Sequence, residues 1–418
     1  MEQITDIIVE KKPAFVGSTV MTATMNITQQ FFTLLKKKIP DTIVIIGGPH
    51  VSALPEKTLK DIPAVDIGVI GEGDNTIIDI LHAFDNNSDL QDVSGIVYRK
   101  NEYIFRTTYR APIENLSTLP IPANHLLKKH LYKSYLWSRW VSGKTCPLGV
   151  IFTSRGCIGK CNFCASRTVF GPKARYFDIQ QVIDQLEFFI NEWDIRILYI
   201  QDDTFTINRK RVNELCDYII KKSYNKRLEI QVSSRVNTVH LPTMKKMRKA
   251  GVRWVFFGIE SGNQEILNKM DKNITLKHIG NGLKVARKAR LFIGGNYIIG
   301  NIGETRQTAM DTINLSCELD QDYASFATAI PLPGTGLFQH CIEKNISLPN
   351  WNDFGSINTP PIPLNRNMDA GELKELREFA VNKFFKRPLY FIKLLIRIDF
   401  LRKSFIVLIF NYIRISDI

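Results

Sequence analysis

The sequence contains no run of about 18 or more apolar residues, which is the length that a membrane-spanning helix requires. Its first residues, Met1–Asp6, show no basic stretch followed by an apolar one, so we expect no secretory signal. Cysteine is scarce, and its seven residues form an odd set in which three lie close together. This pattern does not suit a disulfide scaffold, and it indicates reduced thiols that act as ligands in the cytoplasm.

The remaining composition describes a folded globular protein. Hydrophobic residues make up 44% of the chain and charged residues 23%, values that argue against a disordered or collagen-like protein. The 418 residues suffice for two or three domains of about 150 residues each. The net charge of +14 suits an anionic partner, such as nucleic acid, a phosphorylated cofactor or acidic lipid, without choosing among them.

Strand and helix patterns alternate in the first part of the chain. Short apolar runs at 14–18, 42–46 and 66–70 predict strands, and amphipathic patterns predict helices over 27–39 and 74–84. This alternation predicts a parallel α/β sheet, whose ligands bind at the carboxyl ends of the strands. Three strands are few for an open parallel sheet, so we expect an incomplete domain.

After a predicted hairpin at 95–99 and 103–105, and a linker marked by Pro120 and Pro122, the alternation resumes. It predicts six parallel strands with helices between them, the pattern of a (β/α)6-type barrel with its active site at the strand carboxyl ends. The strands are expected at 149–154, 196–201, 228–234, 253–258, 293–299 and 323–330. Helices are expected at 179–191, 210–222, 241–250 and 305–319.

Three cysteines follow the first barrel strand with the spacing C-x3-C-x2-C: Cys157, Cys161 and Cys164. Thiolates at this spacing can converge on one metal ion or one cluster. Structural zinc sites use four ligands and a [4Fe-4S] cluster usually takes four cysteines, so three cysteines leave one iron open for a non-protein ligand. Two alternatives remain: a zinc site completed by Cys146 or a histidine, and buried cysteines with no ligand role.

The segment resembles the signature loop of radical S-adenosylmethionine (SAM) enzymes, in which an aromatic residue precedes the last cysteine. Phe163 fills that place, and the resemblance covers about residues 147–345. It implies a [4Fe-4S] cluster whose open iron binds SAM, and reductive cleavage of SAM to a 5′-deoxyadenosyl radical that abstracts hydrogen. It also implies an electron donor such as flavodoxin or ferredoxin, while the protein supplies orientation and a dry site.

The resemblance assigns cofactor contacts to the ends of later strands. Asp202 and Asp203 stand where many members carry Gly-Gly-Glu for the SAM ammonium group, and one of them is expected to take that role. The alternative is that either residue caps the helix after Asn208. At the end of the next strand, Ser234 and Arg235 are candidate contacts.

Further candidates follow the last three strands. Glu260 lies at a strand end between glycines, where ribose hydroxyls or Arg235 could satisfy its carboxylate; the alternative is a structural ion pair. Gly300 belongs to a segment similar to the family's Gly-x-Pro-Gly-Glu-Thr, in which Glu304 can cap the next helix. Pro331 opens a Pro-Leu-Pro-Gly-Thr turn that resembles the family's segment near the adenine, although a plain turn explains it equally well.

The first three strands resemble the last three strands of the cobalamin-binding domain that often precedes this barrel. Ser18, Gly47 and Gly48 match positions along which the nucleotide tail of cobalamin lies, and glycine there lets a bulky group approach the backbone. The family's first strands, with their cobalt-ligating histidine, are expected to be missing from this chain. His50 is interpreted as a surface or capping residue rather than a substitute ligand.

The sequence thus predicts an α/β protein: an incomplete Rossmann-like parallel sheet domain, a (β/α)6-type radical SAM barrel and a helical C-terminal region. The expected domains are 1–90 (partial cobalamin-binding domain), 91–146 (hairpin and linker), 147–345 (barrel) and 346–418 (helical region). The implied activity is cobalamin-linked methyl transfer, or radical cyclisation or rearrangement, on a small-molecule or lipid-like substrate. The alternatives are a cobalamin-independent radical SAM enzyme with a vestigial front domain and a non-catalytic metal-binding module.

The last part of the chain, residues 383–418, is basic and rich in apolar residues. It predicts a helix packed on the barrel with a solvated basic face, or contact with an anionic membrane surface in the cytoplasm. We expect no nucleic-acid partner.

Overall fold

The computed structural model describes residues 1–134, 146–351, 354, 360–364, 367–388 and 390. The chain forms two compact units, each built from several segments. Unit 1 comprises Met1–Glu114, Gly156–Lys173 and Ala329–Arg366, and unit 2 comprises Asn115–Arg155, Ala174–Thr328 and Asn367–Ile418. The cysteine motif therefore shares a compact unit with the N-terminal sheet. The domain boundaries expected from the sequence remain predictions.

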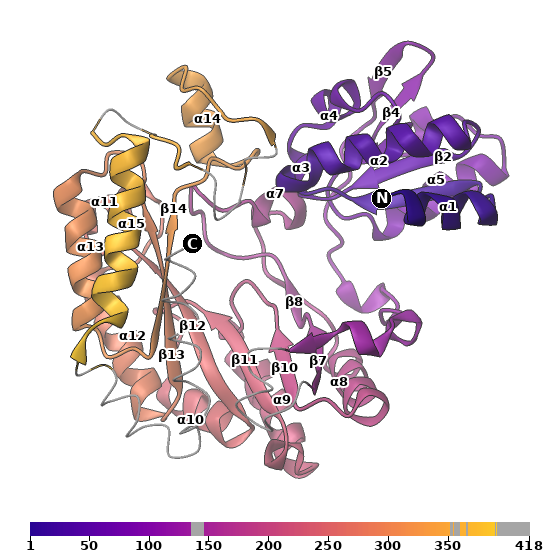
Figure 1. Ribbon diagram of the computed structural model, residues 1–418. Helices are drawn as coiled ribbons and strands as arrows, with labels where there is room; N and C mark the ends of the chain where they lie inside the picture. Colours follow the sequence, from indigo (N-terminus) through magenta and orange to yellow (C-terminus); the bar gives the residue numbers. More distant parts are fainter. Residues whose placement is uncertain (135–145, 352–353, 355–359, 365–366, 389, 391–418) are drawn as a thin grey trace. The chain divides into compact units, whose positions relative to one another are not determined.

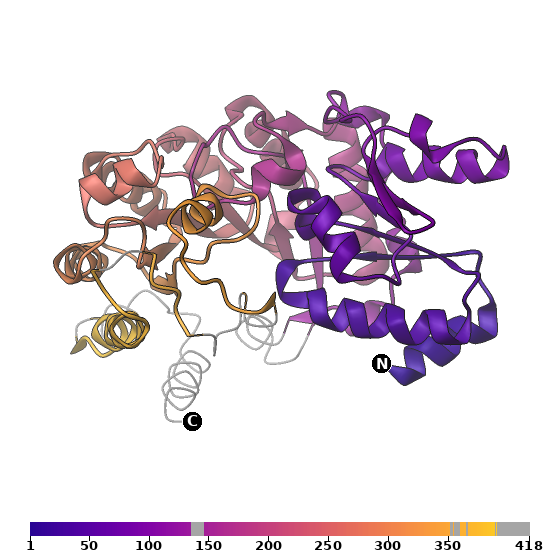
Figure 2. The same ribbon diagram turned by 90° about the horizontal axis from the view of Figure 1, so that it is seen from above.

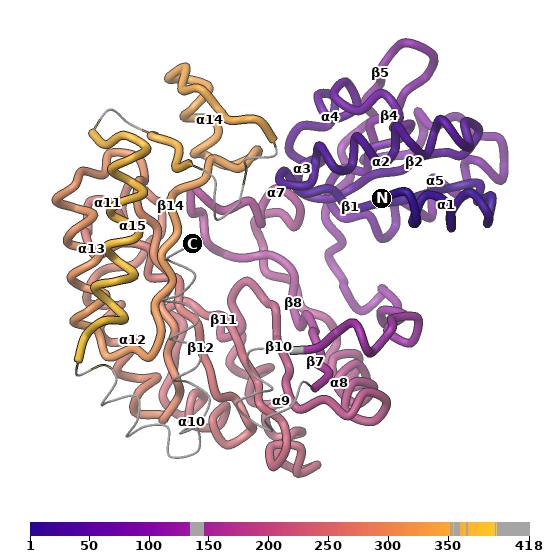
Figure 3. The backbone as a smooth tube through the Cα atoms, in the orientation of Figure 1, coloured from indigo at the N-terminus to yellow at the C-terminus, as the bar shows by residue number. Residues whose placement is uncertain are grey.

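Unit 1 contains a five-stranded sheet in the order β1-β2-β3-β4-β5 (Figures 1 and 3). Its strands are β1 (Phe15–Thr19), β2 (Ile43–Gly47), β3 (Ile67–Val69), β4 (Ile96–Lys100) and β5 (Tyr103–Arg106). β1, β2 and β3 run parallel, whereas β4 pairs antiparallel with both β3 and β5. The three parallel strands and the hairpin predicted from the sequence are confirmed, and with them the Rossmann-like sheet.

Both faces of β2 are buried. Val44 and Ile46 pack with Phe32 of α2 (Met25–Lys38) in one hydrophobic cluster, and Ile45 packs with Ile80 of α5 (Asp74–Asp85) in another. This explains why the β2 sequence is continuously apolar rather than alternating. Helix α1 packs beside α2 (Figures 1 and 2). The helices of unit 1 are α1 (Glu2–Lys11), α2 (Met25–Lys38), α3 (Pro49–Ala53), α4 (Pro55–Asp61), α5 (Asp74–Asp85), α7 (Ser166–Phe170) and α14 (Gly336–Glu343).

Unit 2 contains a seven-stranded sheet in the order β14-β13-β12-β11-β10-β7-β6. Strands β7 and β10 to β14 are parallel, and β6 pairs antiparallel with β7. All six predicted barrel strands are confirmed. The strands are β6 (Lys133–Ser134), β7 (Cys146–Ile151), β10 (Ile197–Ile200), β11 (Glu229–Ser234), β12 (Val252–Glu260), β13 (Phe292–Ile299) and β14 (Tyr323–Thr328). A separate pair is formed by β8 (Ser154–Arg155) and β9 (Arg175–Tyr176).

Helices follow the strands of unit 2 in regular alternation and cover one face of the sheet (Figure 1). The predicted helices after β9, β10, β11 and β13 are confirmed. The helices are α8 (Ile179–Trp193), α9 (Arg209–Lys221), α10 (Leu241–Lys249), α11 (Gln264–Lys269), α12 (Leu276–Lys288), α13 (Arg306–Glu318) and α15 (Ala370–Phe385).

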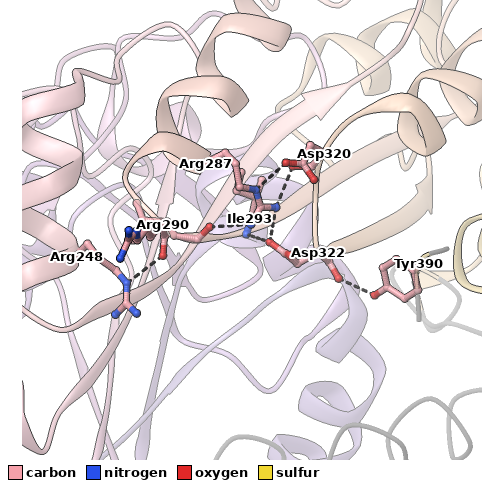
Figure 4. A network of polar contacts seen from close by, with 8 residues as sticks. Arg248, Arg287, Arg290, Ile293, Asp320, Asp322 and Tyr390 are labelled. Atoms are coloured by element: carbon pink, nitrogen blue, oxygen red, sulfur yellow. Dashed lines mark hydrogen bonds and ion pairs between the residues drawn. The ribbon is translucent and has the colours of Figure 1, made fainter. Parts of the chain in front are cut away.

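A polar network connects the amino-terminal ends of β13 and β14 (Figure 4). Arg287 of α12 forms ion pairs with Asp320 at 3.0 Å and with Asp322 at 2.7 Å. The buried Asp322 carboxylate also accepts a hydrogen bond from the backbone N–H of Ile293 at 2.8 Å. The Tyr390 hydroxyl donates to the carbonyl oxygen of Asp322 at 2.6 Å. This network lies at the strand ends opposite those that carry ligand sites in such sheets, so we assign it a structural role.

The predicted helical C-terminal region is confirmed by α15, which packs against α13 and β14. Most of the basic tail, from residue 391 onwards, lies outside the described residues, so its membrane contact stays a prediction. No helix within the described ranges combines the length and the apolar character needed to traverse a bilayer.

Candidate functional site

The three motif cysteines lie between β8 and α7, and their side chains are half-buried. Gly156, directly before Cys157, has a φ of +80°, and a Cβ there would lie 2.4 Å from the carbonyl oxygen of Lys173. Only glycine therefore fits this turn. The backbone N–H of Gly159 donates to Cys157 Sγ at 3.3 Å. No three His, Cys, Asp or Glu side chains of the described residues already surround a single metal position.

Helix α7, which follows the cysteine loop, packs against α3, which follows the predicted cobalamin-binding glycines. The turn after the buried Pro331 meets the same region, because Thr168 Oγ1 of α7 donates to the Gly334 carbonyl oxygen at 3.4 Å. The N–H of Leu337 donates to the carbonyl oxygen of Asn162, inside the cysteine loop, at 3.1 Å. Unit 1 thus brings together three segments that the sequence linked separately to cluster, cobalamin and adenine.

The carboxyl ends of β1 and β2 are packed closely together. Gly48 has a φ of +103°, and a Cβ there would lie 2.6 Å from Thr19 Oγ1 and 2.9 Å from the Val20 carbonyl oxygen. The N–H of Val20 donates to the Gly47 carbonyl oxygen at 2.8 Å. Ser18 is exposed near the end of β1, and its hydroxyl donates to the Thr19 carbonyl oxygen. The contacts of Ser18, Gly47 and Gly48 with cobalamin remain predictions, but all three lie at the strand ends.

The interpretation of His50 as a surface or capping residue is wrong. Its side chain is fully buried, its Nδ1 lies 3.0 Å from Thr22 Oγ1, and its ring lies edge-on to Trp351 with centroids 4.9 Å apart. Burial lowers the pKa of His50 to about 4, so the ring is neutral at pH 7. Because Thr22 follows β1 and His50 follows β2, their contact holds the two predicted cobalamin-binding loops together.

Asp202 and Asp203 have different surroundings at the end of β10. Asp202 is buried, and its carboxylate accepts hydrogen bonds from the N–H groups of Thr153 at 2.6 Å and Ser154 at 3.1 Å, and from the Thr153 hydroxyl. Burial raises the pKa of Asp202. Asp203 is exposed, and Asn208 rather than either aspartate caps α9. Asp202 therefore fixes the turn between β7 and β8, and which aspartate contacts SAM remains a prediction.

Ser234 and Arg235 connect the end of β11 to neighbouring loops. The buried Ser234 hydroxyl shares a cluster of hydroxyl groups with Thr206 and Thr238, which lie 2.6 Å from each other. The buried Arg235 guanidinium donates to the backbone carbonyl oxygen of Lys272. The predicted contacts of both residues with SAM are not tested by this arrangement.

Glu260 lies buried at the end of β12, beside a β-bulge and in the left-handed region with a φ of +68°. Its Oε1 lies 2.6 Å from Lys272 Nζ, and the two side chains are only 8% and 7% exposed. Gly258 makes room for this ion pair, because a Cβ there would lie 2.3 Å from Glu260 Oε1. The carboxylate thus has the structural ion-pair partner that one interpretation of the sequence allowed. Its contact with the ribose of SAM remains a prediction.

Glu304, which the sequence suggested as a helix cap, binds the preceding loop instead. Its Oε2 accepts the N–H of Gly300 and, at 3.3 Å, the N–H of Asn301, while Thr305 caps α13. Its Oε1 is buried with no hydrogen-bond partner among the described residues. Burial raises the pKa of Glu304 to about 7. Gly300 itself has a φ of +87°, and a Cβ there would lie 2.8 Å from Leu373 Cδ2, so glycine is required.

The Glu304→Gln variant is expected to lose a pH dependence of folding stability. In the wild type the unfolded carboxyl ionises near pH 4.5 and the folded one near pH 7. The unfolded state therefore releases its proton first, and stability falls by about 3 kcal/mol as the pH rises between these values. Urea unfolding of reconstituted protein at pH 5 and pH 8 measures the difference, with Glu214→Gln on α9 as an exposed control. A Glu304→Gln variant with the wild-type pH dependence would contradict this account.

Comparison with known proteins identifies the family of this chain. Residues 151–316 match the Radical SAM superfamily, and residues 1–81 match the B12 binding domain. An uncharacterised methyltransferase of Pyrococcus horikoshii is 33% identical over 391 residues, which cover 93% of this chain and 82% of the relative. The chain belongs to the radical SAM superfamily. It is therefore an enzyme, and its cofactors are a [4Fe-4S] cluster, SAM and cobalamin.

This radical SAM enzyme is also similar in sequence to a cyclase and in structure to a methyltransferase. The anaerobic magnesium-protoporphyrin IX monomethyl ester cyclase of Cereibacter sphaeroides is 24% identical over 381 residues, covering 89% of this chain and 60% of the relative. The radical SAM methyltransferase TsrM of Kitasatospora setae, solved with cobalamin and a [4Fe-4S] cluster, superimposes with a TM-score of 0.66 at 16% identity. It covers 81% of this chain and 68% of TsrM, and this likeness shows a shared fold.

The residues present fit the cofactors of the family. Three thiol donors suit a [4Fe-4S] cluster that keeps one iron for SAM. Hydrogen bonds to the sulfur ligands of such a cluster, like the one from the Gly159 N–H to Cys157 Sγ, tune its reduction potential. The tight approach at Gly48 leaves no space for a side chain where the resemblance places cobalamin. Sequence reasoning missed Lys272 as the partner of Glu260, because a lysine in the loop after α11 carries no local sign of an ion pair with a strand end.

Proposed function

We propose that this radical SAM enzyme transfers a methyl group from SAM, by way of cobalamin, to a carbon atom of a small molecule. One observation carries the proposal: within unit 1, the helix that follows the cysteine loop packs on the helix that follows Gly47 and Gly48. A reaction that uses both cofactors needs their binding loops near each other. The Pyrococcus relative, itself named a methyltransferase, supports the same conclusion.

The residues of this chain have separable roles in such a reaction. A bound cluster would supply one electron to SAM, and bound cobalamin would supply the carrier for the methyl group. Cys157, Cys161 and Cys164 hold the cluster, and an electron donor such as flavodoxin or ferredoxin reduces it. The buried contact between His50 and Thr22 keeps the two cobalamin loops in place, and the neutral imidazole adds no charge beside them.

The test uses SAM with a deuterated methyl group. Anaerobically reconstituted protein is incubated with this SAM, cobalamin and a chemical reductant, and mass spectrometry follows S-adenosylhomocysteine and the label. Methyl transfer predicts equal amounts of S-adenosylhomocysteine and of label on cobalamin or on a product. The similarity to the cyclase makes ring formation the second candidate, and 5′-deoxyadenosine without S-adenosylhomocysteine or label would favour it.

A pair of glycine variants supplies the control for this experiment. Gly48→Ala is expected to lower the label on cobalamin, because its methyl group would push the ends of β1 and β2 apart. Gly280→Ala, on α12, places a methyl group in open space and is expected to leave the label unchanged. Equal labelling in both variants would remove the loop at Gly48 from the cobalamin site.

A further inference from the structure

A short segment of unit 2, residues 124–133, combines exposed apolar side chains with positive charge. Its sequence is Asn-His-Leu-Leu-Lys-Lys-His-Leu-Tyr-Lys, and we call it the leucine–lysine segment. Leu126 is 75% exposed and Leu131 is 68% exposed, more than any other leucine, isoleucine or valine of the described residues. Leu127 and Tyr132 are 39% and 40% exposed. A single exposed apolar residue is ordinary, whereas four within ten residues indicate an interaction surface.

The backbone of the leucine–lysine segment is anchored to the rest of unit 2. Lys129 Nζ donates to the carbonyl oxygen of Glu192, at the end of α8, at 3.2 Å. The ring of Tyr132 lies 5.6 Å from the ring of Trp193 of α8, between centroids. The N–H of Leu148 in β7 donates to the Tyr132 carbonyl oxygen at 3.1 Å. The two leucines of highest exposure therefore stand in solvent although the segment that carries them is packed on the fold.

The charges of the segment are all positive. Lys128, Lys129 and Lys133 are exposed, and none of them pairs with a carboxylate in the described part of the chain. The sequence itself has no Asp or Glu from residue 115 to residue 177. The contact of Lys129 with α8 is made to a backbone carbonyl oxygen, so it leaves the charge of the lysine uncompensated. The segment therefore suits an anionic partner.

An anionic lipid bilayer matches both properties of the segment. Its surface offers negatively charged headgroups, and an apolar layer begins about 5–10 Å below them. Leucine side chains can enter that layer while the lysine ammonium groups stay among the headgroups, because the lysine stem is long and apolar. A nucleic acid backbone would pair with the lysines and leave the leucines in water. The combination thus favours a lipid surface.

Helix α1 carries exposed apolar residues in the opposite electrostatic setting. Ile4 is 59% exposed and Ile7 is 55% exposed. The same short helix carries the exposed carboxylates of Glu2, Asp6 and Glu10. Because an anionic bilayer repels carboxylates, exposed apolar residues on α1 are not expected to bind it. This helix therefore provides a control that separates apolar exposure from the match in charge.

We propose that the leucine–lysine segment binds the surface of an anionic lipid bilayer. Leu126 and Leu131 insert at the level of the headgroups, and the lysines bind the lipid phosphates. The inference is separate from the membrane contact predicted for the basic C-terminal tail, most of which lies outside the described residues. It goes beyond the proposed function, since it concerns the surface on which the enzyme works rather than the reaction.

Co-sedimentation with lipid vesicles tests the proposal. The full reconstituted chain is mixed with vesicles of phosphatidylcholine alone, or with vesicles of equal parts phosphatidylcholine and phosphatidylglycerol, and the bound fraction is measured at increasing lipid concentration. We expect binding to the anionic vesicles to be about tenfold or more tighter than binding to the neutral ones. High salt should weaken it, because it screens the lysine charges.

Paired leucine variants locate the insertion. The double variant Leu126→Gln with Leu131→Gln is expected to bind anionic vesicles about tenfold more weakly, because it removes the two side chains that enter the apolar layer. The matched control, Ile4→Gln with Ile7→Gln on α1, replaces two aliphatic side chains that are also more than half exposed and should bind as the wild type does. Equal urea unfolding midpoints show that both variants fold.

Paired lysine variants test the electrostatic part. Lys128→Gln with Lys133→Gln is expected to weaken binding to anionic vesicles by about tenfold, because two charges near the headgroups are lost. Lys277→Gln with Lys284→Gln, two exposed lysines of α12, changes the net charge by the same amount and should have little effect.

Three results would overturn the inference. They are absence of binding to anionic vesicles, equal binding to anionic and neutral vesicles, and wild-type affinity in both the leucine pair and the lysine pair. The last result would place the membrane contact in another part of the chain, such as the basic tail. Breakdown of SAM in solution is expected to be unchanged in the leucine pair, so failure of this inference and failure of the proposed function are distinguishable.

Discussion

Cys161→Ala is expected to reduce the iron and acid-labile sulfide of anaerobically reconstituted protein to background. Two thiolates cannot hold a [4Fe-4S] cluster that already has one fewer protein ligand than most clusters of its kind. Loss of the cluster also removes the binding site for SAM on iron, so SAM breakdown should vanish with it. Iron and sulfide quantitation, together with the visible absorption of the cluster, measures the effect. Normal iron and sulfide in this variant would contradict the assignment of the motif.

Two other cysteines provide the controls for this prediction. Cys317→Ala changes a half-buried cysteine outside the motif and should retain the cluster. Cys146→Ala tests the zinc alternative, in which Cys146 would complete a four-ligand site; the account expects it to keep iron and sulfide. Zinc without labile sulfide in the wild type, and loss of that zinc in Cys146→Ala, would establish a structural zinc site instead.

Lys272→Met is expected to destabilise the protein by about 3–5 kcal/mol. The substitution leaves the Glu260 carboxylate buried without a counter-charge at the end of β12, and removing one partner of a buried ion pair has a cost of this size. The backbone of Glu260 is fixed at a bulge with a positive φ, so its carboxylate cannot readily turn toward solvent. Urea unfolding of the reconstituted protein measures the loss.

The same segment offers a matched control. Lys269 lies three residues earlier and pairs with Glu265 at 2.7 Å, but these side chains are 40% and 73% exposed. Lys269→Met should therefore cost about 1 kcal/mol or less. The double variant Glu260→Gln with Lys272→Met should recover part of the stability, because it leaves no buried charge unpaired. Equal losses of unfolding free energy in Lys272→Met and Lys269→Met would show that the buried ion pair contributes no more to stability than the exposed one.

The strands and helices could be predicted from the spacing of apolar residues along the sequence. The continuous apolar run at 42–46 predicted a strand covered on both faces, and β2 is buried against α2 on one face and α5 on the other. The six barrel strands were found because each carries its own periodicity and ends at a turn. Such signals lie within a few residues of one another, so a single sequence reveals them.

The individual contacts of the site could not be predicted in the same way. His50 was assigned to the surface because nothing near it in the sequence shows that Trp351 covers its ring. Asp202 was a candidate ligand, and only the fold shows that its carboxylate holds Thr153 and Ser154. The packing of α7 on α3 likewise joins segments that are far apart in the chain. These contacts are set by tertiary packing, which leaves no local trace.

We propose that three thiolates hold an iron–sulfur cluster whose remaining iron binds SAM. The most direct test of this proposal is chromatography of the nucleosides formed when reconstituted protein is reduced in the presence of SAM. We expect 5′-deoxyadenosine from the wild type and from Cys317→Ala, and none from Cys161→Ala. Reduced wild-type protein that contains the cluster yet forms no 5′-deoxyadenosine would contradict it.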